Sequence, residues 1–292
     1  MTDMRHKAEA AGFHLVVGLF RLLGPRAAPA LGGWLARTIG PRTSRHRMAT
    51  QGLAQAMPDL AARERETVLD EMWDNLGRVF GEYPHLGRFT SLGASPDVEV
   101  EGRDVLARFA HPDAGALFVS GHFANWELMP LAVAQAGVEG AEVYRAPNNR
   151  AVDRWITAQR QRHIMARQVP KGAAGARALV KCVRSHVSLC MLADQKMNDG
   201  IESMFFGRPA MSPAAPATLA LRYGVPIVPV SFERLGRTSR FRIRFEEPLA
   251  VVPSGDLAAD VARVTGEINR FLEARIRDRP GQWLWLHRRW KD

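Results

Sequence analysis

Short apolar runs alternate with helical patterns through the middle of this chain, and that alternation limits the folds it can adopt. Runs at residues 116–119, 141–144 and 187–193 are typical of buried strands. Helical patterns between them include residues 150–165 and 173–184. Strands that alternate with helices usually lie parallel in one sheet. We therefore predict an α/β fold whose central, largely parallel sheet is flanked by helices on both faces.

Two later runs add strands of a different character. Residues 225–232 contain Pro226 and Pro229, and because proline cannot donate to a sheet ladder we expect an edge strand or a bulge there. Residues 240–245 alternate strictly between arginine and apolar side chains, which predicts a strand with one apolar and one cationic face. A last strand-like segment is expected at residues 283–286.

The most distinctive stretch follows the first of these apolar runs. Ser120 and Gly121 end the run, and a helical pattern begins near Asn125. His122 and Glu127 are thereby placed at the carboxyl end of a strand, where open α/β sheets bind their ligands. On one regular helix these two side chains would point about 140° apart. They can meet only if His122 lies on the loop and Glu127 in the first helical turn.

An imidazole beside a carboxylate can act as a general base that is held in one tautomer. The chain has no Gly-x-Ser-x-Gly motif, and neither Cys182 nor Cys190 lies in a sequence that suggests an activated thiol. We infer that His122 would activate a hydroxyl that belongs to the substrate. On spacing alone, a strand-end histidine and a solvated acid at a helix start fit equally well.

Composition narrows the class of protein and its partners. The chain is 46% hydrophobic and 24% charged, which suits a folded globular domain and argues against disorder. Its formal net charge of +10 indicates anionic partners, which include nucleic acid, an acidic membrane face, an acidic protein or a phosphorylated substrate. Two cysteines provide neither a disulfide framework nor a zinc signature, so we expect a reducing compartment and no metal site.

The N-terminal residues 1–40 are predicted to be a membrane-associating segment that precedes a domain over residues 41–292. Residues 13–23 form an apolar run that is shorter than the roughly 20 residues of a membrane span. Together with the broken apolar stretch at residues 27–39, they suggest a monotopic anchor or a hairpin. A helix packed on the core and a cleaved signal peptide are the alternatives, although Arg21 argues against a signal peptide.

Five short motifs occur in order along the chain. They are residues 121–127 (GHFANWE), residues 144–149 (YRAPNN), Asp194-Gln195, residues 205–207 (FFG) and residues 283–291 (WLWLHRRWK). Together they resemble the lauroyl/myristoyl acyltransferases of lipid A biosynthesis, which belong to the lysophospholipid acyltransferase superfamily. The resemblance covers most of the chain. In it, His122 and Glu127 match the superfamily's catalytic motif of a histidine and an acid five positions later.

The resemblance implies an O-acyltransferase that moves a fatty acyl group from an acyl carrier protein thioester to a hydroxyl of a lipid A precursor. His122 would be the general base and Glu127 would orient it. No cofactor is expected, because the thioester already carries the activation. The implied partners are acyl carrier protein, an anionic lipid acceptor and the cytoplasmic face of the cell inner membrane, with no nucleic acid.

The resemblance and the chemistry also give candidate substrate-binding residues. Arg145 and the backbone N–H groups of residues 121–123 could stabilise the oxyanion. Arg208, which follows the fourth motif, and the basic residues of the fifth motif could surround the acceptor's phosphates. The full set of substrate-binding candidates is Arg145, Asn148, Asp194, Gln195, Phe206, Arg208, Arg288 and Arg289. Two other functions remain open, namely acylation of a lysophospholipid or an amino-acid lysolipid, and a basic membrane- or RNA-binding role without catalysis.

Overall fold

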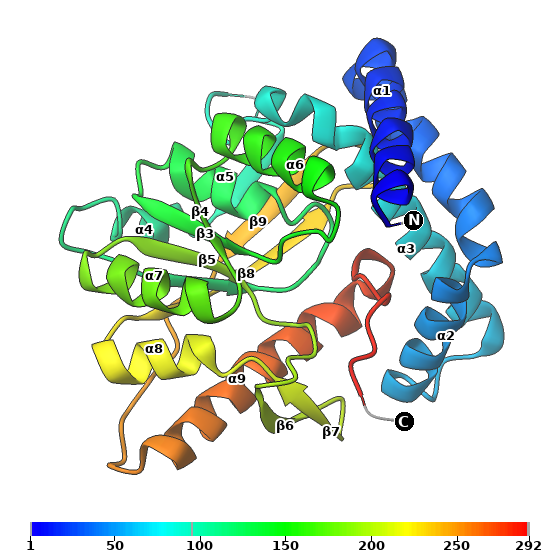
Figure 1. Cartoon of the computed structure of the whole chain (residues 1–292). Coiled ribbons are helices and arrows are strands. Elements are labelled where there is room, and N and C mark those ends of the chain that lie inside the picture. Colours follow the sequence, from blue (N-terminus) through cyan, green and yellow to red (C-terminus); the bar gives the residue numbers. More distant parts are fainter. Residues whose placement is uncertain (1, 95, 291–292) are drawn as a thin grey trace.

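A computed structural model, which describes residues 2–94 and 96–290, confirms the predicted α/β fold (Figure 1). Seven strands form one sheet in the order β1-β9-β8-β2-β5-β3-β4. Neighbouring strands are parallel except for the antiparallel pair β8 and β9. The strands are β1 Val98–Glu101, β2 Leu117–Ser120, β3 Gly140–Tyr144, β4 Arg167–Pro170, β5 Ser188–Leu192, β8 Ile227–Arg234 and β9 Phe241–Phe245.

Helices cover both faces of this sheet (Figure 1). Helices α5 and α6 lie on one face, and α7, α8 and α9 lie on the other, while α1, α2 and α3 form a group at one side. A small hairpin of β6 Ile201–Phe205 and β7 Arg208–Ser212 contacts α9. The helices are α1 Thr2–Ile39, α2 Ser44–Ala56, α3 Ala62–Glu82, α4 Arg103–Ala107, α5 Leu128–Gln135, α6 Arg150–His163, α7 Ala173–Arg184, α8 Ala215–Tyr223 and α9 Leu257–Asp278; η1 Gly40–Arg42, η2 Tyr83–Arg88 and η3 Pro280–Gln282 are short 3₁₀ turns.

The strand that precedes His122 lies in the middle of the core. β2 pairs with β5 on one side and with β8 on the other. Its Leu117, Phe118 and Val119 side chains are fully buried, and burying each such side chain typically contributes about 1.5–3 kcal/mol. The backbone from which the His122 loop begins is therefore rigidly held.

The prediction of an edge strand at residues 225–232 is wrong, because β8 lies between β2 and β9. Its first part pairs with β2 as far as Pro229, and its second part pairs with β9 from Val230 onward. Pro229 thus lies where the strand changes neighbours, and its carbonyl still accepts a hydrogen bond from the backbone of Glu246 at 3.0 Å. The change of partner is what allows a proline inside the sheet. Residues 283–286 form a single bridge, from Trp283 to Phe123, in place of the expected strand.

Helix α1 bends at Gly24, where φ is 76°. After the bend it packs closely on α3, because a side chain at Gly32 or Gly77 would collide with the backbone of the other helix. Before the bend, Leu15, Leu19 and Leu22 share one face and are exposed to solvent. One helical region, Met4–Arg42, is long and apolar enough to cross a membrane by length and composition. The division into a membrane-associating segment and a domain remains a prediction.

Candidate active site

The His122 imidazole is held by Asp194. Asp194 follows β5, the neighbour of β2, so the carboxyl ends of the two strands bring the residues together. The Nδ1 atom of His122 lies 2.8 Å from Asp194 Oδ1, and the His122 backbone N–H donates to Asp194 Oδ2 at 2.8 Å. The indole of Trp283 donates to the same Oδ2 at 2.8 Å. Gly121 permits this close approach, because a Cβ there would press on Asp194 and on the Phe123 ring.

These contacts define the tautomer of the base. Burial alone would raise the pKa of Asp194, but the charge of His122 and its hydrogen bonds outweigh burial and hold that pKa well below its usual range. The carboxylate is therefore ionised and can only accept hydrogen bonds. His122 Nδ1 carries the proton, which leaves a lone pair on Nε2. This is the form of imidazole that can take a proton from a hydroxyl.

A second histidine lies beside the first and was not singled out in the sequence. The side-chain nitrogen of Gln195 is 3.0 Å from His122 Nε2 and 2.9 Å from His287 Nε2. The two imidazole rings are 5.5 Å apart. Burial, followed by the charge of His122, lowers the pKa of His287 to about 4, so His287 is neutral at pH 7. The Gln195 amide thus donates to both lone pairs, one on each imidazole.

Glu127 does not hold His122 as the sequence predicted. It lies at the start of α5 and is fully buried, and its carboxylate accepts two hydrogen bonds from Arg160, at 2.6 and 2.8 Å. The hydroxyl of Tyr83 donates to it at 2.7 Å. Within the described residues no hydrogen bond joins Glu127 to His122. The prediction failed because the loop turns the two side chains toward different elements.

Helix α3 supports the loop through polar side chains on its buried face. Asn75 donates to the carbonyl of Ala124 at 2.9 Å, and Asn125 donates to Glu82 at 3.0 Å. Arg234 of β8 donates to both Glu82 and Asn75. These polar side chains are not among the site residues predicted from the sequence. Asn75 lies three residues after Met72, and Glu82 lies three residues after Val79, so both fall on the apolar face of the helix. Polar residues on an apolar face need hydrogen-bonding partners, and this spacing is the sequence signal that indicates them.

The C-terminal segment supports the same loop from another direction. Ala124 donates its backbone N–H to Gln282, and Leu284 donates to the carbonyl of His122. The N–H groups of His122 and Phe123 are also bonded, to Asp194 and to the carbonyl of Gly121. In this conformation these two groups cannot serve as the oxyanion donors that we expected.

Two of the predicted substrate-binding residues, Asp194 and Arg289, are buried inside the protein. Asp194 is completely buried, and its two oxygens accept hydrogen bonds from His122 and Trp283. Arg289 is also buried; it lies over the Phe205 ring at 4.5 Å and donates to Met211 and Ser212 of β7. Burial lowers its pKa to about 10. Its guanidinium therefore holds the β6–β7 hairpin and lies beneath the surface where we expected a cationic rim.

The other predicted residues divide between the core and the surface. Gln195 is half-buried next to His122, and Phe206 is buried against Phe205 and Trp290. The exposed candidates are Arg145, Asn148, Arg208 and Arg288. Lys291, the last residue of the fifth motif, lies outside the described residues.

An apolar cavity of about 290 Å³ lies at the carboxyl ends of β3 and β5, and neither His122 nor Asp194 belongs to its lining. Met191 and Leu192, which directly precede residues 193–194, line it together with Leu179 of α7. Lys171 lies at the same place, and its ammonium is 3.4 Å from the carbonyl of Leu192. Burial lowers the pKa of Lys171, while the charge of Asp194 opposes that change. A half-buried cation and an apolar cavity thus lie near the strand end that carries Asp194.

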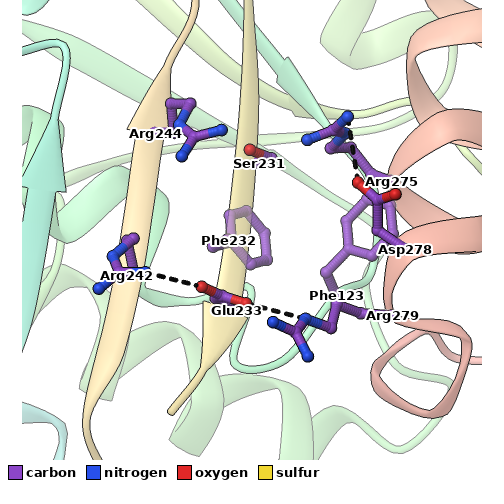
Figure 2. A pocket seen from close by; sticks show the side chains of 9 residues that line it. All are labelled: Phe123, Ser231, Phe232, Glu233, Arg242, Arg244, Arg275, Asp278 and Arg279. Atoms are coloured by element: carbon purple, nitrogen blue, oxygen red, sulfur yellow. Dashed lines mark hydrogen bonds and ion pairs between the residues drawn. The ribbon is translucent and has the colours of Figure 1, made fainter.

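A larger cavity of about 500 Å³ lies between β8, β9 and the end of α9 (Figure 2). Phe123 of the loop lines it, and its cations are Arg242, Arg244, Arg275 and Arg279. Glu233 lies between Arg242 and Arg279, at 3.2 and 3.0 Å. The arginines of this cavity already have acidic partners, and His122 is not part of its lining. Among the described residues no cluster of three or more histidine, cysteine or acidic side chains could hold a metal ion.

The chain is similar in sequence to known acyltransferases. The family described as bacterial lipid A biosynthesis acyltransferase matches residues 3–292. A lipid A biosynthesis palmitoleoyltransferase of Escherichia coli (strain K12) is 23% identical over 262 residues, which are 89% of this chain and 82% of that protein. A phosphatidylinositol mannoside acyltransferase of Mycobacterium tuberculosis is 24% identical over 291 residues, which are 97% of this chain and 87% of that protein.

Proposed function

Because the chain belongs to the bacterial lipid A biosynthesis acyltransferase family, we propose that it transfers a fatty acyl group from an acyl carrier protein thioester to a hydroxyl of a lipid A precursor. The observation that carries this proposal is the His122 imidazole, whose Nδ1 proton is bound by ionised Asp194 and whose Nε2 lone pair faces a displaceable amide. His122 is the catalytic residue, and Asp194 is a positioning residue.

The reaction uses this lone pair directly. The acceptor hydroxyl replaces the Gln195 amide at His122 Nε2 and loses its proton to that nitrogen as its oxygen attacks the thioester carbonyl. The C–S bond then breaks, the thiolate leaves with the proton from His122, and an ester remains on the acceptor. Asp194 stabilises the imidazolium between these steps. Gln195 stays bound to His287 and returns when the product leaves.

The acyl group binds at the apolar cavity and Lys171. The cavity takes part of the acyl chain, since its lining is mostly aliphatic and it opens at the ends of β3 and β5. The ammonium of Lys171 interacts electrostatically with both Asp194 and His287. In place of the backbone N–H groups, Lys171 stabilises the developing oxyanion. Exposed Arg145 is a second cation, close enough to Lys171 to interact with it electrostatically.

Glu127 contributes by holding structure close to the base. Its bonds to Arg160 and Tyr83 fix the start of α5, which directly follows the His122 loop. The acceptor's phosphates meet the exposed cations Arg208 and Arg288 at the surface. The exposed apolar face of α1 supports association with a membrane. We propose that this membrane is the inner membrane and that the enzyme acts at its cytoplasmic face, with acyl carrier protein as the donor.

The similarity to a phosphatidylinositol mannoside acyltransferase favours a second candidate acceptor, a hydroxyl of a phosphoinositide glycolipid. Both acceptors are phosphorylated glycolipids, and the proposed chemistry at His122 is the same for each.

The proposal is tested by offering the purified protein acyl carrier protein thioesters together with each acceptor and identifying the products by mass spectrometry. We expect acylation of the lipid A precursor and loss of product in His122→Ala. The control is His111→Ala, which changes an exposed histidine in the loop before β2. Preferred acylation of a lysophospholipid or an amino-acid lysolipid would reject the acceptor class. Lipid or RNA binding without any transfer would reject the enzyme assignment.

A further inference from the structure

A cationic cavity lies beside the bend of α1, away from the residues that contact His122. Its volume is about 610 Å³, and it lies between α1, η2 and the turn that joins β8 to β9. Five arginines and two acids line it, and the arginines are Arg26, Arg78, Arg88, Arg237 and Arg240. None of the residues that contact His122 belongs to this lining.

The cavity keeps a net positive charge: Arg237 and Arg240 are paired with Asp70 and Glu99, and the lining acid Asp97 can offset only one of the remaining arginines. Arg78 is paired with Asp74, and Glu82 is paired with Arg234. The charges of these two lining residues are therefore neutralised by partners inside the protein. Arg26 and Arg88 are exposed and have no hydrogen-bonding or acidic partner in residues 2–94 and 96–290. Two unpaired guanidinium groups on one cavity are suited to the oxygens of a phosphate group.

The helix that forms one wall of the cavity carries an apolar surface on either side of it. Before the bend, Leu22 is 88% exposed and Leu19 lies on the same face. After the bend, Arg26, Ala30 and Trp34 follow at four-residue spacing, so the cavity's own arginine lies in line with a half-exposed tryptophan. Leucines that enter the acyl region, with tryptophan and arginine at headgroup level, are the pattern of an interfacial helix.

We propose that this cavity binds the phosphate headgroup of an anionic phospholipid in the membrane on which α1 lies. The acyl chains of that lipid would lie along the exposed leucines of α1, and its phosphate would contact Arg26 and Arg88. The site is distinct from the base, because the cavity lining contains neither His122 nor a residue that contacts it, and the carboxylate of Glu82 in the lining is already bonded to Asn125 and Arg234. It does not depend on the proposed acyl transfer.

The test is binding of the full chain to vesicles, without any acyl donor or acceptor. One vesicle is phosphatidylcholine alone, and the other contains phosphatidylglycerol in addition. Each arginine near an anionic membrane contributes roughly fivefold to partitioning, so Arg26→Gln/Arg88→Gln is expected to lose about 25-fold on the anionic vesicle. The matched control, Arg177→Gln/Arg270→Gln, removes the same charge from exposed positions on α7 and α9 and should lose less than about threefold.

A third variant distinguishes binding of the headgroup in the cavity from attraction by general surface charge. Ala30→Phe fills part of the cavity, adds apolar surface and leaves the charge unchanged. We expect it to bind phosphatidylcholine vesicles at least as well as the unchanged protein and to lose most of the preference for phosphatidylglycerol. Thermal unfolding of each variant checks that the protein remains folded.

Three results would overturn the proposal. Equal losses in the two double variants would show that only total charge matters. Tight binding of glycerol phosphate in solution, with no vesicle preference, would indicate a free phosphate ligand. Normal binding to phosphatidylglycerol with a loss confined to vesicles that carry the lipid A precursor would assign the cavity to the acceptor.

Discussion

Asp194→Asn changes one atom of the side chain that holds the base, and its effect follows from the three hydrogen bonds that Asp194 accepts. The backbone N–H of His122 and the indole N–H of Trp283 share Oδ2, and the imidazole Nδ1–H has Oδ1. Asparagine has one oxygen and one NH₂ group. It can place the oxygen toward the two N–H groups or toward the imidazole, but it cannot satisfy all three donors.

The orientation with the oxygen toward the two N–H groups is favoured, because it gives both of them an acceptor. Turning the oxygen toward His122 Nδ1 would leave the His122 backbone N–H and the Trp283 N–H without an acceptor, at a cost of about 1–3 kcal/mol each. The asparagine NH₂ group therefore faces Nδ1 and moves the imidazole proton to Nε2. An Nε2 that carries hydrogen cannot take the proton of the acceptor. We expect kcat to fall by about 10²–10⁴, the usual contribution of a general base.

The assay is release of free thiol from acyl carrier protein thioester in the presence of saturating acceptor. The acceptor KM should change less than about threefold, because Asp194 is buried and does not contact substrate. Asp113→Asn, an exposed position before β2, is the matched control. A soluble, folded Asp194→Asn protein with near-normal kcat would refute the assignment. A comparable loss of kcat in Glu127→Gln at unchanged stability would instead support Glu127, as predicted from the sequence, as the carboxylate that orients the base.

Three further predictions concern buried charges. Among the described residues, Glu127→Ala leaves Arg160 with Glu142 as its remaining acidic partner. The variant should lower the free energy of unfolding by about 3–5 kcal/mol in urea titration, whereas an unchanged midpoint would contradict the buried pair. Burial, followed by the charge of Glu127, raises the pKa of Glu142 from 4.5 to about 7. The folded protein then holds a proton that the unfolded chain releases, so stability should fall as pH rises from 4.5 to 7, and Glu142→Gln should remove up to about 3 kcal/mol of that fall; equal pH profiles for both proteins would exclude this account. Arg289→Ala should lower the melting temperature through loss of its bonds to β7, while Arg288→Ala, at an exposed position, should leave it unchanged; similar effects of the two would show that the buried contact is unimportant.

The sequence by itself determined the sheet class and the edge at which the site forms. Hydrophobic periodicity distinguishes strands from helices, and chain direction then places the end of each parallel strand at one edge. His122 and Asp194 each follow an apolar run, at residues 116–119 and 187–193, and the structure brings the two side chains together. The resemblance drawn from five motifs is confirmed by the family match over residues 3–292.

Only the tertiary structure decided which side chains meet. Strand order and register determine the partner of His122, and periodicity encodes neither, so the acid five residues away was preferred over Asp194, 72 residues away. His287 and the polar residues of α3 reach the loop from elements that have no sequence relation to it. Burial likewise separates Arg288, which is exposed, from Arg289, which holds the β6–β7 hairpin. Two adjacent arginines have the same chemistry in the sequence, and only packing against Phe205 determines which one is withdrawn from solvent.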